Sequence, residues 1–317
     1  MSSGSSALGL RRALIVAKKD YRDAVRSWEL WSLMALFILF TAGFYFALNK
    51  SDLLTLFWPS FLTFIGGSNF GLTTVEFIGF YVGLAEAVLP VVVLTVTHKA
   101  IAGEVESGSV KFLFSAPLTR FDAIVGKILG RAGVLWTGVA LGFVVSAGVI
   151  VYLGGQFSPV PYLLFLLFTC LFVLAYVSVG VALSAIAQTS SRAVLYVISF
   201  FIGVGLLLDY VPNLIHKVTD GVFFPKRIPM PGSFMQGPPD APAWFFFIPR
   251  LSPGRAYNHA VIGLVSNQPF GYEPAVAPEG GPLPFYLTGW FALATLVLWI
   301  VVPALVGYWH FNRTDIN

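Results

Sequence analysis

The stretch "PYLLFLLFTCLFVLAYVSVGVALSAIA" (residues 161–187) determines the fold class. It carries no charged side chain from Pro161 to Ala187. A helix needs about 20 mostly apolar residues to cross the roughly 30 Å hydrocarbon core of a bilayer, at about 1.5 Å of rise per residue. We therefore predict that this stretch is a membrane-spanning helix.

The rest of the chain supports the same interpretation. Hydrophobic residues make up 57% of the sequence and charged residues only 11%, whereas soluble domains carry about 25% charged residues. The apolar runs lack the alternation of an outer-membrane β-barrel, and a helix satisfies its backbone hydrogen bonds within the span. We predict an all-α polytopic membrane protein with six transmembrane helices. Their ranges are 28–48, 73–97, 130–155, 161–187, 191–211 and 283–311.

Lysine and arginine indicate the orientation, because loops on the cytoplasmic side are enriched in both. Most of the 19 basic residues flank the apolar runs on one side. With six spans, this places both termini in the cytoplasm of a multi-pass protein of the cell membrane. The net charge of +4 is thus explained by topology and does not indicate nucleic-acid binding. The residues on this side are Arg11, Arg12, Lys18, Lys19, Arg22, Arg26, Lys99, Lys111, Arg120, Lys127, Arg131, Arg192 and Arg313.

Residues 1–27 form the cytoplasmic N-terminus and include an amphipathic pattern. Apolar side chains such as Leu14, Ala17 and Tyr21 recur at steps of three and four residues, while basic side chains fall mainly on another face. This pattern predicts an interfacial helix with its cations near lipid headgroups. Either it anchors the topology or it presents a working surface to a cytoplasmic partner.

Residues 28–211 contain the first five predicted spans and, at 98–129, a charged loop that includes "GEVESGSVKFLFSAPLTRFDAIVGK" (103–127). Breaks at Gly108 and Pro117 predict two short helices, at about 99–106 and 109–115, and then an amphipathic lead-in to the third span. Exposed carboxylates on a compact helical turn are suited to docking in a groove on another protein. The simpler alternative is a charged loop that only solvates the reversal of the chain.

Residues 212–283 have a different composition, because most of the 20 prolines fall there or directly after it, among aromatic residues. We predict an external cap at the membrane surface that ends in a short amphipathic helix at about 254–266. It either covers an exit path or receives an external partner, or it is an insertion with no part in transport. Residues 284–317 complete the chain with the sixth span and a short cytoplasmic tail.

Within the spans, Glu86 is the side chain most suggestive of function, since an ionisable residue at membrane depth is energetically costly. It is a candidate for the translocation path, as a contact for substrate or protons. The alternative interpretation, of equal weight, is a protonated acid that is hydrogen-bonded between helices. Small residues such as Ser178 and Ala182 are instead typical of close helix packing.

No pattern in the sequence indicates catalysis. The four histidines are scattered, and the single cysteine stands in an apolar span, so no metal-binding cluster is predicted. Motifs of metalloproteases, of serine hydrolases and of nucleotide-binding loops are absent from the sequence. We expect no catalytic residue, no metal and no cofactor on this chain.

The charged loop resembles the cytoplasmic motif of ABC-2 type permeases, with a subgroup likeness to the permease of nitrous-oxide-reductase maturation. That motif has an acid pair, Gly-Ser/Thr, a Leu-Leu-Ser-like group, Pro, Arg and then Gly-Lys. Val110 and Phe114 depart from it but stay apolar. The later "LSPGRAYNHAV" (251–261) is also similar to the family. The matching positions in the loop are Glu104, Glu106, Gly108, Ser109, Ser115, Pro117, Arg120, Gly126 and Lys127.

The resemblance implies a non-catalytic permease subunit of an ATP-driven exporter. Two copies, or this chain and a paralogue, would pair with two separate ATPase subunits that bind ATP and Mg. Glu104 and Glu106 would lie on the coupling helix at the ATPase surface, with Arg120 and Lys127 bracing the return helix at the inner membrane surface. The alternative is a membrane scaffold or signalling subunit, whose coupled ATPase drives a conformational change for an external maturation partner without solute transport.

Overall fold

The computed structural model describes seven parts of the chain, and every regular element in them is a helix. The predicted first span (28–48) lies outside them. The described ranges are 15–19, 21–22, 74–108, 119–152, 156–220, 243–266 and 284–313.

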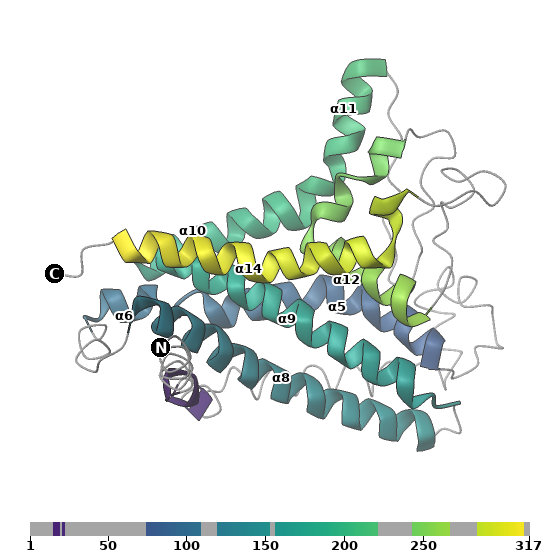
Figure 1. Ribbon diagram of the computed structural model, residues 1–317, viewed down its shortest axis with the longest axis horizontal. Coiled ribbons are helices and arrows are strands. Elements are labelled where there is room, and N and C mark those ends of the chain that lie inside the picture. The colour runs from purple at the N-terminus through teal and green to yellow at the C-terminus, as the bar shows by residue number, and fades with distance from the viewer. Residues whose placement is uncertain are drawn as a thin grey trace, which may run out of the picture.

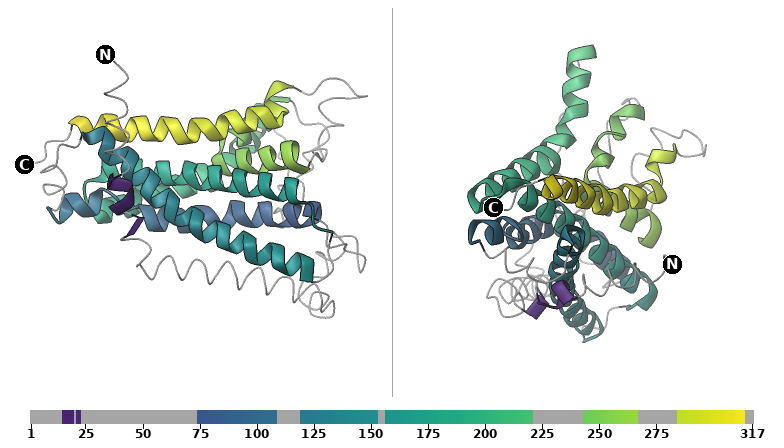
Figure 2. Two further views of the ribbon diagram at one scale, coloured as in Figure 1. Left: turned by 60° about the horizontal axis from the view of Figure 1, so that its bottom comes forward. Right: turned by 60° about the vertical axis from the view of Figure 1, so that its left-hand side comes forward.

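Four described helical stretches are long and apolar enough to cross a membrane. They run along a common direction as a bundle (Figures 1 and 2). This confirms the predicted class, an all-α polytopic membrane protein, whereas the count of six spans stays a prediction. The four are α5 (Thr74–Thr97, in a stretch that continues to Glu106), α8 (Arg120–Tyr152), α9 (Pro159–Ala187) and α14 (Gly289–Arg313).

The predicted fifth span is a helical path with a change of winding. It begins as α10 (Ser190–Phe200), where the Thr189 hydroxyl accepts a hydrogen bond from the Arg192 N–H as an N-cap. A π-helical turn, η2 (Phe201–Leu207), and a 3₁₀ turn, η3 (Leu208–Tyr210), lead into α11 (Val211–Asp220). The helix therefore extends past residue 211, into the segment that the composition assigns to an external cap.

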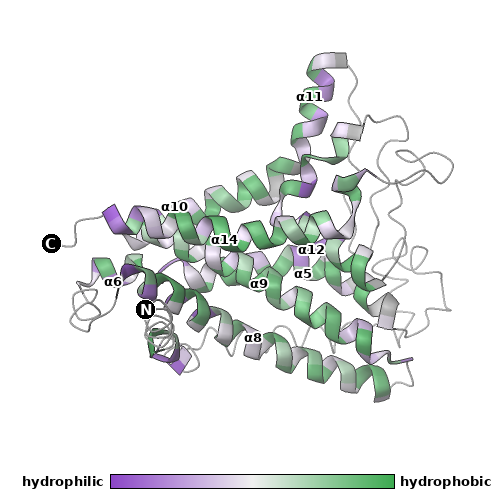
Figure 3. Ribbon diagram, viewed as in Figure 1, coloured by the Kyte–Doolittle hydropathy of each residue, from purple (hydrophilic) through white to green (hydrophobic). Residues whose placement is uncertain are grey.

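The two ends of the bundle differ in their elements (Figure 1). One end carries α6 (Ala102–Glu106), the start of α8 and the end of α14, and we name it the α6 end. Hydrophilic residues gather there (Figure 3). The opposite end carries α12 (Pro253–Val261), and we name it the α12 end. The shorter elements around α12 are η4 (Ala243–Phe246), η5 (Pro249–Leu251), η6 (Ile262–Ser266) and η8 (Phe285–Leu287).

Helix α9 is the centre of the bundle, because α5, α8, α10, α12 and α14 all pack against it. Small residues permit the closest of these contacts. A Cβ atom added at Gly180 of α9 would overlap the hydroxyl of Thr97 on α5, and one added at Gly307 of α14 would lie 2.8 Å from the Cα atom of Ala182. Ala182, predicted from the sequence as a packing residue, thus lies at the crossing of α9 and α14.

Helix α12 occupies a different position from the one that its sequence predicts. It starts at an N-cap, Ser252, whose hydroxyl accepts a hydrogen bond from the Arg255 N–H. Its apolar face is fully buried against α5, α9 and α14, with Tyr257 and Val261 both 0% exposed. The expected position on the membrane surface is therefore wrong for α12, because three helices of the bundle cover its apolar face.

A substitution at Gly180 tests the contact between α5 and α9. Gly180→Ala should lower the free energy of unfolding by about 1–3 kcal/mol, because a methyl group has no space beside the buried Thr97. Thermal unfolding of the purified protein in detergent measures the effect. Gly148→Ala on α8 is the matched control, since a Cβ there meets nothing within 4 Å. Equal melting of the two variants would contradict the contact.

Candidate functional site

Helix α6 is a single turn that follows α5 after a short reversal at residues 98–101. It ends where the sequence predicts a break, since Gly108 adopts a left-handed backbone conformation with φ of 71°. That conformation suits glycine and commonly terminates helices. Ser109, Ser115 and Pro117 of the predicted loop lie outside the described residues.

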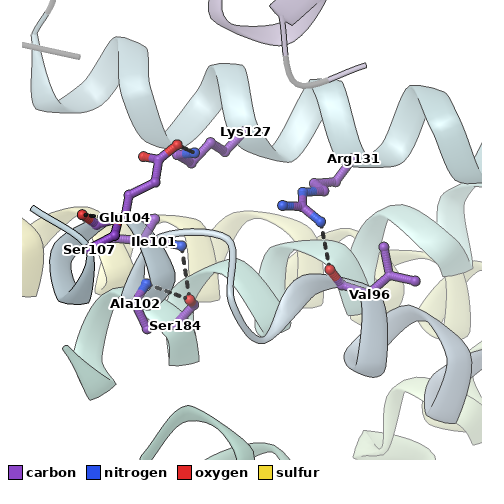
Figure 4. A network of polar contacts seen from close by, with 8 residues as sticks. All are labelled: Val96, Ile101, Ala102, Glu104, Ser107, Lys127, Arg131 and Ser184. Atoms are coloured by element: carbon purple, nitrogen blue, oxygen red, sulfur yellow. Dashed lines mark hydrogen bonds and ion pairs between the residues drawn. The ribbon is translucent and has the colours of Figure 1, made fainter. Parts of the chain in front are cut away.

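The start of α6 is held by α9. The Ser184 hydroxyl oxygen accepts hydrogen bonds from the backbone N–H groups of Ile101 and Ala102, both at 3.0 Å (Figure 4). N–H groups at a helix start have no partner within their own helix, and an outside acceptor satisfies them. Ser184 is 0% exposed, so this contact fixes α6 to the core of the bundle.

Glu104 and Lys127 connect α6 to α8. The Lys127 Nζ atom donates to the Glu104 Oε1 atom at 2.7 Å (Figure 4). The Lys127 side chain is only 3% exposed, and that of Glu104 is 25% exposed. A buried ammonium group is costly without a partner, and Glu104 supplies one for Lys127. Lys127 therefore faces α6, and its predicted place at the inner membrane surface stays a prediction.

Arg131, one turn further along α8, reaches α5. Its Nη1 atom donates to the Val96 carbonyl at 2.7 Å (Figure 4). Val96 lies in the last turn of α5, where carbonyl groups lack partners within the helix. Helix α8 is thus bound on both sides of the reversal at residues 98–101. Arg131 binds the end of α5 before it, and Lys127 binds α6 after it.

Glu106 links α6 to α10. Its Oε2 atom accepts a hydrogen bond from the Ser190 N–H at 3.0 Å. A carboxylate at a helix N-terminus is stabilised by the free N–H groups and by the helix dipole. Glu106 is itself exposed, so it combines a contact inside the protein with access from outside.

Arg120 acts at the neighbouring end of α14. Its Nη1 atom donates to the Phe311 carbonyl, and its guanidinium group lies 5.5 Å from the centre of the Phe311 ring. Residues 119–122 fix this first turn of α8, because Thr119 and Asp122 each accept a hydrogen bond from the other's backbone N–H. Arg120 therefore braces α8 against α14.

The structure thus brings some predicted residues together and separates others. Glu104 pairs with Lys127, and Glu106 and Gly108 lie at the end of the same helix. Sequence reasoning missed Ser184, and it assigned Arg131 only to the basic flank of the spans. Nothing in their local sequence marks them, because each acts on a backbone group from another helix.

The N-terminal segment also contacts α8. Residues 15–19 are helical, with Val16 buried and Lys18 and Lys19 exposed. The Tyr21 hydroxyl lies 3.2 Å from the Thr137 Oγ1 atom, and the Tyr21 ring lies over Gly133, since a Cβ there would be 3.5 Å from it. The described part of this segment therefore lies against the helix that pairs with α6.

Glu86 lies in a second polar cluster, towards the α12 end. Its Oε2 atom accepts a hydrogen bond from the Asn258 Nδ2 atom at 2.8 Å, and its Oε1 atom lies 3.7 Å from the Arg255 Nε atom. Gly254 permits this approach, because a Cβ there would be 3.1 Å from the Glu86 Cγ atom. Glu86 therefore connects α5 to α12. A role in the translocation path stays a prediction.

Further contacts position α12. The Tyr257 hydroxyl lies 2.9 Å from the Thr169 Oγ1 atom, and the Tyr257 ring stacks on Phe172 at 4.3 Å between ring centres. Arg250, 1% exposed, donates to the Tyr286 carbonyl at 3.1 Å and lies 3.5 Å from His259 Nδ1. The "LSPGRAYNHAV" segment thus supplies two contacts to Glu86 and one stacked ring, and the buried guanidinium group of Arg250 directly precedes it.

Apolar helices of membrane length, packed around α9 and joined at one end by charged contacts, define a multi-pass membrane protein. The family model described as "ABC-2 family transporter protein" matches residues 14–316. The chain therefore belongs to that family, as the charged loop indicates, and it is a membrane permease subunit of an ABC transporter.

Two relatives agree with this assignment. A "Probable ABC transporter permease protein NosY" of Stutzerimonas stutzeri is 24% identical over 311 residues, which cover 94% of this chain and 97% of the relative. A protein with the same name from Pseudomonas aeruginosa is 25% identical over 228 residues, which cover 68% of this chain and 74% of the relative.

Removing the Glu86 carboxylate tests the contact between α5 and α12. Glu86→Ala should destabilise the protein by roughly 1–3 kcal/mol, because Asn258 and the largely buried Arg255 both lose an acceptor. Thermal unfolding in detergent measures the loss. Glu86→Gln keeps an amide oxygen for Asn258 and should lose less. Val91→Ala, at an exposed position on the same helix, is the control. A Glu86→Ala variant that melts with the wild type would refute this role.

Proposed function

We propose that this chain is the permease subunit of an ATP-driven exporter with six spans. Two copies, or one copy and a paralogue, pair with separate ATPase subunits that carry ATP and Mg. Movement of those subunits enters through residues 98–129 and reaches the spans that flank this loop. The α6 end then faces the cytoplasm, together with both termini.

The position of α6 is the observation that carries this proposal. Three hydrogen bonds tie a single helical turn to α9, α8 and α10. They involve the Ser184 hydroxyl, the Lys127 Nζ atom and the Ser190 backbone N–H. A loop that only reverses the chain needs no such attachment. A force applied to α6 passes to three helices at once, because close-packed elements move as units and do not deform smoothly.

The distribution of basic residues supports the orientation. At the α6 end the described chain carries Lys99, Arg120 and Arg131 beside the flanks of α5 and α8, and Arg192 and Arg313 lie near the same end. Cytoplasmic flanks of membrane helices have this excess of lysine and arginine.

Exchanging the charges of Glu104 and Lys127 tests whether this ion pair positions α6. Glu104→Lys and Lys127→Glu each bring like charges together and should reduce permease-dependent ATP hydrolysis at least tenfold, while the double variant restores the pair and most of the activity. The assay uses the full chain in nanodiscs with a candidate ATPase subunit. Lys217→Glu, at an exposed position on α11, is the matched control. A double variant as inactive as both single variants would exclude positioning by this pair.

A substitution at Glu106 separates docking of the ATPase subunit from the positioning of α6 within this chain. Glu106→Gln keeps an oxygen that accepts the Ser190 N–H but removes the exposed negative charge. We expect several-fold weaker binding of the ATPase subunit with an unchanged melting temperature, measured by co-purification and by thermal unfolding. If the wild type binds no ATPase subunit, and neither Glu104 nor Glu106 matters for ATP hydrolysis, the proposed function is wrong.

A further inference from the structure

Helix α6 lies where α9 turns into α10. Helix α9 ends at Ala187 and α10 begins at Ser190, so two residues separate them, and we name residues 187–190 the elbow. Gln188 has a left-handed backbone conformation with φ of 61°, which is uncommon for a residue with a Cβ atom. Thr189 is extended. A conformation of this kind persists where the surrounding contacts hold it, and α6 supplies several of those contacts.

Hydrogen bonds from α6 lie on both sides of the elbow. Before it, the Ser184 hydroxyl in the last turn of α9 accepts the N–H groups at the start of α6 (Figure 4). After it, the Ser190 N–H in the first turn of α10 donates to the Glu106 Oε2 atom at 3.0 Å. The short helix therefore bridges the two helices that meet at the elbow.

Alanine side chains fill the space between these hydrogen bonds. Ala102 of α6, Ala187 at the end of α9 and Ala193 of α10 form one buried cluster, in which each side chain is at most 1% exposed. Small side chains let helix backbones approach closely, and a close-packed contact transmits displacement because it has no free volume to absorb it. A displacement of α6 therefore presses on both helices of the elbow.

Helix α10 has few other buried contacts within this chain. Ala193 is the one buried residue among its eleven, all of which the structure describes. At the opposite end of α10, the Phe200 ring contacts the rings of Tyr176 on α9 and Trp299 on α14 edge-on. Within the chain, α10 is thus held near its two ends, and α6 supplies the contact at the first of them.

We propose that α6 positions α10 through the elbow, so that movement of the ATPase subunits is delivered to the predicted fifth span. Glu106 is then a positioning residue for α10 as well as a docking residue, and the elbow is the hinge, since a few residues at the ends of helices absorb changes in φ and ψ. The proposal rests on the proposed function and adds a destination for the same movement. The alternative is a movement confined to α5 and α8, the spans that flank the loop.

Two substitutions break the contact between α6 and α10 in different ways. Ser190→Pro removes the N–H donor. Position 190 is the first of α10, where proline is favoured, and Thr189 before it already has the extended backbone that proline requires, with φ of −130° and ψ of 148°. Ala193→Leu inserts bulk between α10 and α6. Val194→Leu, at the exposed neighbouring position, is the matched control.

Amide hydrogen exchange measures the movement. The full chain in nanodiscs is combined with a candidate ATPase subunit, and peptides from the elbow and from the first turns of α8 are followed by mass spectrometry with and without trapped nucleotide. In the wild type and in Val194→Leu, we expect nucleotide to change the exchange rate several-fold in both regions. In Ser190→Pro and Ala193→Leu, the change at the elbow should largely disappear, while the change in α8 and the amount of bound ATPase subunit remain.

Thermal unfolding first establishes which variants are folded. A full response of the elbow in either folded variant would overturn the proposal. A wild-type elbow that does not respond while α8 does would also overturn it, because the movement then stays in the spans that flank the loop. If the wild type binds no ATPase subunit, or if α8 does not respond either, the proposed function itself fails, and this result is distinct from the other two.

Discussion

The ion pair between Lys127 and Glu104 is the contact on which the arrangement at the α6 end depends. An ammonium group that is 3% exposed requires a partner, and Glu104 of α6 supplies a carboxylate oxygen at 2.7 Å. The Lys127 charge thus selects the position of α6 against α8. Ser184 and Arg131 then satisfy backbone groups on either side of the reversal, which removes the remaining freedom of the short helix.

Helix α5 connects this site to the other polar cluster. Glu86 holds α12, and Val96 and Thr97 hold α8 and α9, so one helix carries contacts to both ends of the bundle. Pro90 lies between them and lacks the N–H group that would bond the Glu86 carbonyl. Helix α5 is therefore easier to bend at this point, and the Glu86 contact to α12 lies one turn before it.

The sequence predicted the parts of this structure that depend on local pattern. Apolar length predicted the helices around α9, the αL-prone Gly108 marked the end of α6, and the acid, Gly, Arg and Lys spacing indicated the family. It could not predict that Lys127 faces Glu104, that Ser184 caps α6 or that α12 is buried, because these are contacts between segments far apart in the chain. The inward polar face of α11, where Asn213 and His216 are buried, was missed for another reason. Proline-rich composition predicts turns, but it does not show which side of a short amphipathic helix meets the protein.

The two ends of the bundle are stabilised by different interactions. At the α6 end, hydrogen bonds from charged groups and backbone groups hold the short helix α6 in one position. At the α12 end, stacking of Tyr257 on Phe172 and burial of Arg250 hold α12 inside, while α11 presents aliphatic side chains outward. Apolar contacts are non-directional, so the apolar packing at this end can shift by small amounts at little cost. A hydrogen-bonded ion pair such as Lys127 with Glu104 cannot shift in this way, because its energy depends on both distance and direction.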